Sequence, residues 1–189
     1  MVQVPERIIT LEEFLKQPET KPASEYINGQ IIQKPMPQGK HSKLQGKLVT
    51  VINQLVEESK VAMAFPELRC TFGGCSVVPD VTVFAWERIP VDESGDIANV
   101  FPLAPNWIIE ILSPDQSSTK VTGIILHCLN HGTEIGWLID PKARSILVFP
   151  QGKQPQLLKK KEEILPVPDL VGDLSLSVGD LFSWLKLSF

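Results

Sequence analysis

The sequence predicts an α/β (α+β) protein with a mixed β-sheet flanked by helices, and two observations support this prediction. Apolar residues recur at spacings of three and four over residues 41–59, which is typical of an amphipathic helix. Two short apolar runs, 76–86 and 106–112, are bounded by Gly, Pro or Ser and are typical of buried strands. A chain of 189 residues with 43% hydrophobic residues fits one domain spanning 1–189.

The N-terminal part of the chain predicts a short helix followed by a hairpin. Thr10 and Glu13 have the spacing of a capping box, so a helix is expected to begin there. Asn28-Gly29 between apolar residues is a strong signal for a two-residue hairpin turn. We therefore expect residues 24–32 to form two antiparallel strands.

A second pair of strands is expected to contain an acid. Residues 61–72 and 76–86 are joined by Gly73-Gly74-Cys75, which predicts an antiparallel pair with a tight turn. Asp80 would then lie inside the second strand. The following segment, 87–105, is rich in proline and polar residues and is predicted to be a loop.

The C-terminal half predicts two further helices and a strand hairpin. Ser117-Ser118-Thr119 offers caps for a helix that ends near Gly132. Residues 134–140 and 145–149 are expected to be strands joined by a turn, and Ser177 is expected to cap a final short helix.

Net charge, cysteine content and hydrophobic run length bear on nucleic-acid binding, metal binding by cysteine and membrane insertion. The net charge of -4 provides no general attraction for nucleic acid, so any DNA contact would need a local basic patch or a metal ion. The three cysteines are Cys70, Cys75 and Cys128, which show no paired metal-type spacing. This odd number of cysteines and the lack of a signal-peptide pattern at the N-terminus lead us to expect a reduced, cytoplasmic setting. No apolar run reaches the roughly 20 residues of a membrane helix, so we expect no membrane partner.

Two acids stand inside apolar runs that should form the core. Asp80 follows Val77-Val78-Pro79, and Glu110 lies within residues 106–112. Burying two ionised carboxylates costs several kcal/mol unless they are compensated. A shared divalent cation is one compensation, since Mg²⁺ (or Mn²⁺) prefers oxygen ligands. Salt-bridged structural acids are the alternative.

Several motifs occur in a recognisable order: 78–81 (VPDV), 107–114 (WIIEILSP) and 136–141 (GWLIDP). Together with Glu25-Tyr26-Ile27-Asn28-Gly29 and the later His41, they resemble the Uma-two-type endonuclease family, which is abundant in cyanobacteria. The resemblance covers residues 10–185. It implies the restriction endonuclease-like core of the PD-(D/E)XK nucleases, Mg²⁺-dependent hydrolysis of DNA and often a homodimer. It also implies that Asp80 and Glu110 are the metal ligands.

The lysine of the superfamily motif is missing from its usual place. Two residues after Glu110, where that lysine would share the acid's face, the chain has Leu112. In the Uma-type family the lysine stands instead in the following helix, at a position matched here by Ile124. Lys120 lies one helical turn earlier and is the candidate third catalytic residue, or else a solvated lysine.

Two further residues are candidates for the site. Glu25 matches an acidic position of the family and could add a third carboxylate, although a salt bridge to Arg69 or Lys43 is an equal alternative. His41 at a helix start could contact phosphate or relay a proton; otherwise it is a helix-entry residue.

Three functions therefore remain open. The first is a metal-dependent endonuclease. The second is a degenerate nuclease fold that binds or assembles without cutting. The third is a structural oligomer, in which Asp80 and Glu110 would each contact an Arg or Lys and no cleft would be open.

Overall fold

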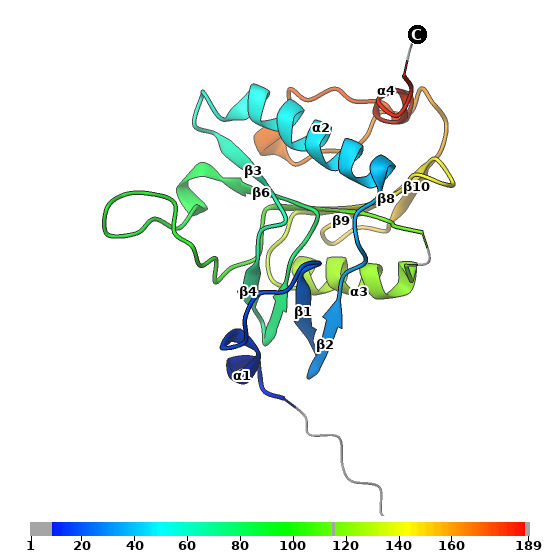
Figure 1. The fold of residues 1–189 in the computed structure, drawn as a ribbon. Helices are drawn as coiled ribbons and strands as arrows, with labels where there is room; N and C mark the ends of the chain where they lie inside the picture. Colours follow the sequence, from blue (N-terminus) through cyan, green and yellow to red (C-terminus); the bar gives the residue numbers. More distant parts are fainter. Residues whose placement is uncertain (1–8, 115, 188–189) are drawn as a thin grey trace, which may run out of the picture.

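A mixed six-stranded sheet forms the centre of the protein. The computed structural model describes residues 9–114 and 116–187. The strands run in the order β10-β9-β8-β7-β6-β3, and only β7 and β8 are parallel neighbours within this sheet as described. Their bounds are β3 Ala62–Pro66, β6 Val81–Ala85, β7 Trp107–Ile111, β8 Ile135–Asp140, β9 Ser145–Pro150 and β10 Gln156–Leu158. The predicted mixed sheet flanked by helices is thus confirmed (Figure 1).

A second, four-stranded antiparallel sheet was not anticipated from the sequence. Its order is β2-β1-β5-β4, and it lies on the same side of the large sheet as α3 (Figure 1). Its strands are β1 Ser24–Ile27, β2 Gln30–Gln33, β4 Cys70–Phe72 and β5 Cys75–Val77. The predicted hairpin at Asn28-Gly29 is confirmed, since both residues have the positive φ that such a turn requires.

The two long strands expected at 61–72 and 76–86 are each broken into two, and this corrects the placement of Asp80. Glu67 adopts a φ of 46°, and Pro79 cannot donate a ladder hydrogen bond. The pairing therefore continues as β4 with β5 in the small sheet and as β3 with β6 in the large one. Asp80 lies in the connection between β5 and β6, directly before β6, and not inside a strand.

Four α-helices surround the sheets in the part of the chain that is described. They are α1 Leu11–Leu15, α2 Gly39–Val56, α3 Ser118–Leu129 and α4 Val178–Ser183, with short 3-10 turns at Trp86–Arg88 and Asp169–Val171. The capping predictions are confirmed: α1 has a capping box of Thr10 with Glu13, and Ser117 and Ser177 cap α3 and α4. Among the described residues no helix is both long and apolar enough to span a bilayer.

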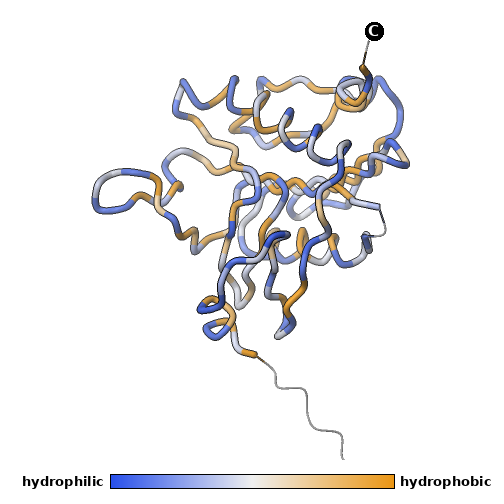
Figure 2. Tube along the Cα trace, in the orientation of Figure 1, coloured by the Kyte–Doolittle hydropathy of each residue, from blue (hydrophilic) through white to orange (hydrophobic). Residues whose placement is uncertain are grey.

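The large sheet separates two hydrophobic cores. Figure 1 shows α2 and α4 on one face and α3 on the other, and in Figure 2 apolar segments follow the strands between them. Along β7, Ile109 and Ile111 belong to the core under α2, whereas Ile108 belongs to the core under α3. By strand alternation Glu110 shares the face of Ile108 and therefore points to the α3 side.

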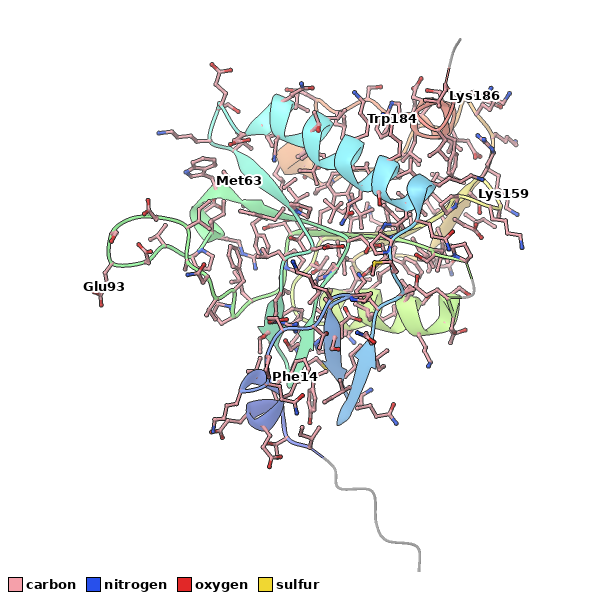
Figure 3. All side chains as sticks on the ribbon, in the orientation of Figure 1. Phe14, Met63, Glu93, Lys159, Trp184 and Lys186 are labelled. Atoms are coloured by element: carbon pink, nitrogen blue, oxygen red, sulfur yellow. The ribbon has the colours of Figure 1, made fainter. Side chains whose placement is uncertain are left out.

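The loop between β6 and β7 is held at its base. The Asn106 side chain accepts hydrogen bonds from the Ala85 backbone N–H (2.9 Å) and from Arg88 (2.7 Å). Figure 3 shows Glu93 at the outer part of this loop, away from the sheet. These bonds close the base of the loop, so β6 and β7 remain paired next to Asp80 and Glu110.

Asn53 ties α2 to the free edge of β3. Its side chain accepts a hydrogen bond from the Ala64 N–H (2.7 Å) and donates one to the Ala64 carbonyl (3.0 Å). We expect Asn53→Ala to lower the free energy of unfolding by about 1–3 kcal/mol, because both partly buried backbone groups lose their partner. Urea unfolding would measure this. Thr50→Ala, which removes only a hydrogen bond within the exposed helix surface, should cost less than about 0.5 kcal/mol; equal costs would contradict the prediction.

Candidate active site

Asp80 occupies the junction of the two sheets and is the centre of a buried polar cluster. Only 2% of the residue is exposed. Oδ1 accepts a hydrogen bond from Lys34 Nζ at 2.7 Å, and Oδ2 accepts one from the Ile111 backbone N–H at 2.7 Å. His41 Nε2 lies 3.0 Å from the same Oδ2. The carboxylate is therefore fixed from three different segments of the chain.

Lys34 bridges the two acids that the sequence singled out. Its Nζ contacts Asp80 Oδ1, lies 3.6 Å from Glu110 Oε2, and also donates to the Val78 carbonyl at 2.7 Å. The side chain is only 12% exposed. Lys34 follows β2 directly, so the β1–β2 hairpin carries the ammonium group into the junction.

Glu110 is almost completely enclosed. It is 1% exposed in the middle of β7, and its Oε1 has no hydrogen-bond partner within the described part of the chain. Native proteins satisfy most buried polar atoms, so an orphan oxygen of this kind needs an explanation. One explanation is a ligand that completes the cluster.

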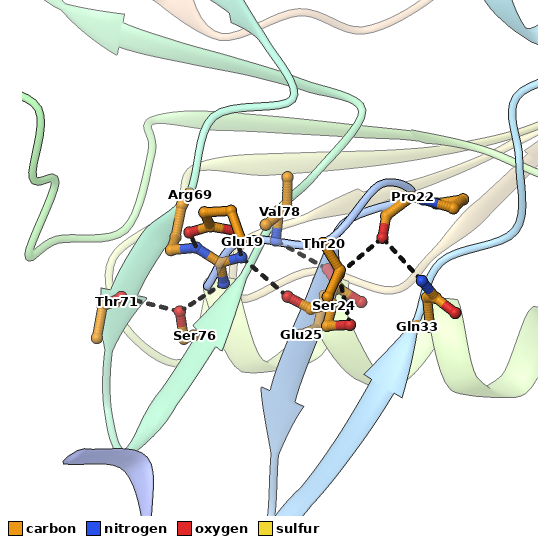
Figure 4. A network of polar contacts seen from close by, with 10 residues as sticks. All are labelled: Glu19, Thr20, Pro22, Ser24, Glu25, Gln33, Arg69, Thr71, Ser76 and Val78. Atoms are coloured by element: carbon orange, nitrogen blue, oxygen red, sulfur yellow. Dashed lines mark hydrogen bonds and ion pairs between the residues drawn. The ribbon is translucent and has the colours of Figure 1, made fainter. Parts of the chain in front are cut away.

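Glu25 reaches the same junction from β1. Its Oε1 accepts the Val78 N–H at 2.8 Å, and the residue is 3% exposed. Figure 4 shows this bond beside a neighbouring network in which Arg69 pairs with Glu19. Of the two ion pairs considered for Glu25, the described structure thus contains neither: its hydrogen bond is to the backbone.

The first turns of α2 add two side chains to the cluster. His41 is the third residue of α2 and is 5% exposed; its Nδ1 has no partner among the residues described. Gln45, one turn further, donates from Nε2 to the Asp80 carbonyl at 2.9 Å. Residues four apart share a helix face, so α2 positions both the side chain and the backbone of Asp80.

Burial and the lysine move the pKa values of the two acids in opposite directions. Burial would raise the pKa of Asp80, but the Lys34 charge and the His41 hydrogen bond outweigh it and hold that pKa well below its usual value. Burial raises the pKa of Glu110 well above its usual value; Lys34 offsets this only in part, and the charge of Asp80 adds to it. The cluster thus has one strongly ionised acid and one that retains its proton to higher pH.

The charge network also affects the other two titratable groups. Burial raises the pKa of Glu25, with partial compensation from Lys34. Burial would lower the pKa of Lys34, but Glu110 and Asp80 overcome this and keep its pKa above the ordinary value. These two acids therefore favour the cationic form of Lys34 at the junction.

Lys120 lies at the rim of this site. It is exposed in the first turn of α3 and, in the part of the chain described, has no polar contact with Asp80 or Glu110. It lines a cavity of about 720 Å³ between the β1–β2 hairpin and α3, which Glu25 and Lys34 also line. Leu112, in the usual lysine position, packs at the margin of the α3 core.

Sequence reasoning missed Lys34, although one signal was present. The Asn28-Gly29 turn pairs Glu25 with Ile32. Residues 32 and 34 share a face by alternation, so the hairpin by itself predicts that Lys34 and Glu25 lie side by side. The contact with Asp80, 46 positions away, has no local signal because it depends on how the two sheets meet.

The cluster is accessible from outside. A cavity of about 440 Å³ is lined by Lys34, His41 and Asp80, together with Ser113 and Gln116 after β7. The structural alternative required both acids to be paired and no cleft to be open. Both acids do face Lys34, but the cavity beside Asp80 does not fit that alternative.

The donor set fits a hard cation, although incompletely. Asp80 and Glu110 supply carboxylate oxygens, and Oε1 of Glu110 has no partner in the described chain. Within residues 9–114 and 116–187, no group of three or more His, Cys, Asp or Glu side chains is arranged to hold a metal ion. The fit to an ion such as Mg²⁺ therefore rests only on the chemical kind of these two carboxylates, because that ion prefers oxygen ligands.

Comparison with known proteins identifies the family of the chain. No curated protein matches the chain. A solved structure, described as a putative nuclease belonging to DUF820 from Anabaena variabilis ATCC 29413, is 58% identical with a TM-score of 0.93. That similarity covers 94% of this chain and 99% of the other. The model of the Uma2 family, described as "Putative restriction endonuclease", matches residues 11–179. Because this match spans most of the sequence, the chain belongs to the Uma2 family.

Proposed function

We propose that the protein is a metal-dependent endonuclease that hydrolyses phosphodiester bonds of DNA. In this proposal Asp80 and Glu110 hold Mg²⁺ or Mn²⁺, and Lys34 acts beside them. Glu25 and His41 complete the site: Glu25 lies in electrostatic contact with Lys34 and Asp80, and His41 contacts Asp80 directly. Family membership and the nuclease description of the Anabaena relative support the general activity.

The position of Lys34 is the observation that carries this proposal. The absence of lysine at position 112 left a degenerate nuclease open when only the sequence was considered. Lys34 Nζ, at 2.7 Å from Asp80 Oδ1 and 3.6 Å from Glu110 Oε2, provides a buried ammonium group from another segment. Asp80 and Glu110 thus have a lysine beside them in the folded protein, although the sequence has leucine at the position where the superfamily motif has lysine.

The chemistry follows from these groups. A bound divalent ion supplies Lewis-acid stabilisation and lowers the pKa of its water, which is the established role of such ions in phosphodiester hydrolysis. Lys34 is placed to stabilise negative charge that develops on the phosphate oxygens. His41 Nε2 and the Ile111 N–H both hold Oδ2 of Asp80, so the carboxylate needs little reorganisation.

Plasmid nicking tests the proposal directly. Purified protein with Mg²⁺ or Mn²⁺ should convert supercoiled plasmid to the open circle, and EDTA should prevent it. Asp80→Ala should reduce the rate at least about 100-fold, the scale for loss of one group that stabilises the transition state. Lys120→Ala, which removes a side chain without a described polar contact to the acids, should retain activity within about tenfold.

Each result has a distinct meaning. Nicking that persists in Asp80→Ala would refute the site. A large loss in Lys120→Ala, with Asp80→Ala also inactive, would assign Lys120 the catalytic role instead of Lys34. A wild-type protein without nicking on DNA or RNA would favour the second candidate, a nuclease fold that binds without cutting.

The homodimer is a separate proposal that rests on the family resemblance alone. Sedimentation equilibrium of the full chain would test it, with a mass of twice 21.0 kDa expected for the dimer.

A further inference from the structure

We propose that the start of helix α2 binds a DNA phosphate next to the one that is cut, through free backbone N–H groups and the side chains of Lys40 and Lys142. This inference rests on the proposed function, because it places a second contact for the same substrate. These groups adjoin the cluster around Asp80, because His41, Ser113 and Gln116 line both cavities.

A cavity is present at this helix start. It has a volume of about 720 Å³ and lies between the first turn of α2, the segment after β7 and the turn between β8 and β9. Lys40 and Lys142 face it from opposite elements, and both are exposed. The cavity is thus formed by three segments that are distant in the sequence.

The first turn of α2 has unused hydrogen-bond donors. Gln38 is the N-cap but makes no side-chain cap, and the first turn has no acidic residue. The first bond within the helix runs from the Ser42 N–H to the Gln38 carbonyl, so the N–H groups of Gly39, Lys40 and His41 have no helical partner. Such groups, together with the helix dipole, form an anion-binding position.

Gly39 leaves this position open. A Cβ atom built there would meet no atom within 4 Å. A phosphate could therefore approach the backbone of the first turn without steric obstruction.

His41 provides an independent indication of a ligand. The residue is 5% exposed, lines this cavity as well as the one beside Asp80, and its Nδ1 has no partner among the described residues. Because Nε2 contacts Asp80, the ring joins the proposed phosphate position to the catalytic acid. Gln116 also lines both cavities, so the two are neighbours along one surface.

The charge around the cavity favours a polyanion. Asp140 is the only acidic residue among the described residues that line it, and its Oδ1 already accepts the N–H groups of Lys142 and Ala143 at 2.8 and 2.9 Å. Neither Lys40 nor Lys142 forms an ion pair within the described chain. In a protein of net charge -4, this local excess of cations meets the requirement for a DNA contact that the overall charge does not supply.

DNA binding, measured separately from cleavage, tests the inference. The fluorescence anisotropy of a labelled duplex of about 20 base pairs would be titrated with the full-length protein in EDTA over a range of salt concentrations. Lys40→Ala and Lys142→Ala should each weaken binding and reduce the slope of log K against log salt by about 1, as expected for loss of one phosphate contact. Lys60→Ala is the matched control, because it removes the same charge past the other end of α2, about 27 Å along the helix axis.

Gly39→Asp separates binding from folding. An acid in the first turn should leave the melting temperature unchanged or raise it, since it complements the helix dipole. The same charge should weaken DNA binding about tenfold or more, because it occupies and repels the proposed phosphate position. Weak binding with an intact fold would support the inference.

The inference and the proposed function can fail independently. Binding by Lys40→Ala, Lys142→Ala and Gly39→Asp equal to that of Lys60→Ala would overturn the phosphate site, even if metal-dependent nicking is present. A wild-type protein with no measurable binding to the duplex would overturn it as well. Absence of nicking, together with binding that these three substitutions weaken, would support the phosphate site and reject the endonuclease.

Discussion

Replacing Lys34 by methionine is expected to abolish metal-dependent nicking and to destabilise the protein by about 3–5 kcal/mol, the cost of leaving a buried charge without its partner. The reason is the environment of Asp80, which is only 2% exposed. In the described structure Lys34 is the one lysine or arginine that forms an ion pair with this carboxylate. Methionine fills a similar volume but cannot donate to Asp80, to Val78 or toward Glu110. Urea unfolding and plasmid nicking would measure the two effects.

Lys120→Met is the matched control for this substitution. It removes the same charge from an exposed position at the rim of the site, and its unfolding free energy should change by less than about 0.5 kcal/mol. If Lys34→Met were as stable and as active as Lys120→Met, the central role assigned to Lys34 would be wrong.

A double-mutant cycle distinguishes loss of the ion pair from general damage. In the wild-type background Asp80→Asn should destabilise the protein, because the ion pair with Lys34 is lost. In the Lys34→Met background the same substitution should stabilise it, because an uncompensated buried charge is removed. A change of sign is expected only if the two side chains act as a pair.

Glu110→Gln is expected to stabilise the protein at neutral pH while eliminating its nicking activity. Burial raises the pKa of Glu110 above its ordinary value of 4.5, so the unfolded chain releases this proton at a lower pH than the folded chain. The contribution of Glu110 to stability is therefore complete below about pH 4.5 and declines as the pH rises toward the folded pKa. The amide of the variant does not titrate, and we expect a gain of about 1–3 kcal/mol at pH 7–8, the scale of one buried polar penalty.

Asp80→Asn should show the opposite dependence on pH. The pKa of Asp80 in the folded protein lies below its ordinary value of 3.8, so its ionised form stabilises the fold above that pH. This contribution is lost as the pH falls through the folded pKa. Asp80→Asn should therefore be less stable than the wild type at neutral pH, and the difference should diminish below about pH 3.8.

Chemical denaturation of the wild type and both variants between about pH 3 and pH 8 would test this pair of predictions. The difference between Glu110→Gln and the wild type should grow with pH, and that for Asp80→Asn should shrink as the pH falls. Parallel curves for all three proteins would contradict the opposite pKa shifts. A Glu110→Gln variant that still nicks plasmid would separate this residue from the metal site.

Local sequence signals were sufficient for most secondary structure. The Asn28-Gly29 hairpin, the capping boxes at Thr10 and Ser177 and the period of α2 depend on interactions within a few residues. The alternation along β7 also predicted that Glu110 and Leu112 share a face, but it did not identify the helix that covers that face. These features could be predicted because their causes lie in neighbouring positions.

The broken strands were harder to predict. Pro66, Glu67 and Pro79 mark the interruption, yet the runs 61–72 and 76–86 each read as one apolar strand. Their separation into two sheets depends on burial against different partners, β7 on one side and β1 on the other. A competition between tertiary partners is not encoded in the local pattern of either run.

The sequence by itself determined that two acids, Asp80 and Glu110, would be buried and would need compensation, because each stands in an apolar run. Only the tertiary structure decided what stands beside them. Lys34, His41 and Gln45 lie 46, 39 and 35 positions before Asp80, and they meet it because the β1–β2 hairpin and α2 pack on opposite sides of the connection between the sheets. The physical reason is that ion pairing and desolvation act through space, so the partner of a buried charge is set by packing and not by spacing along the chain.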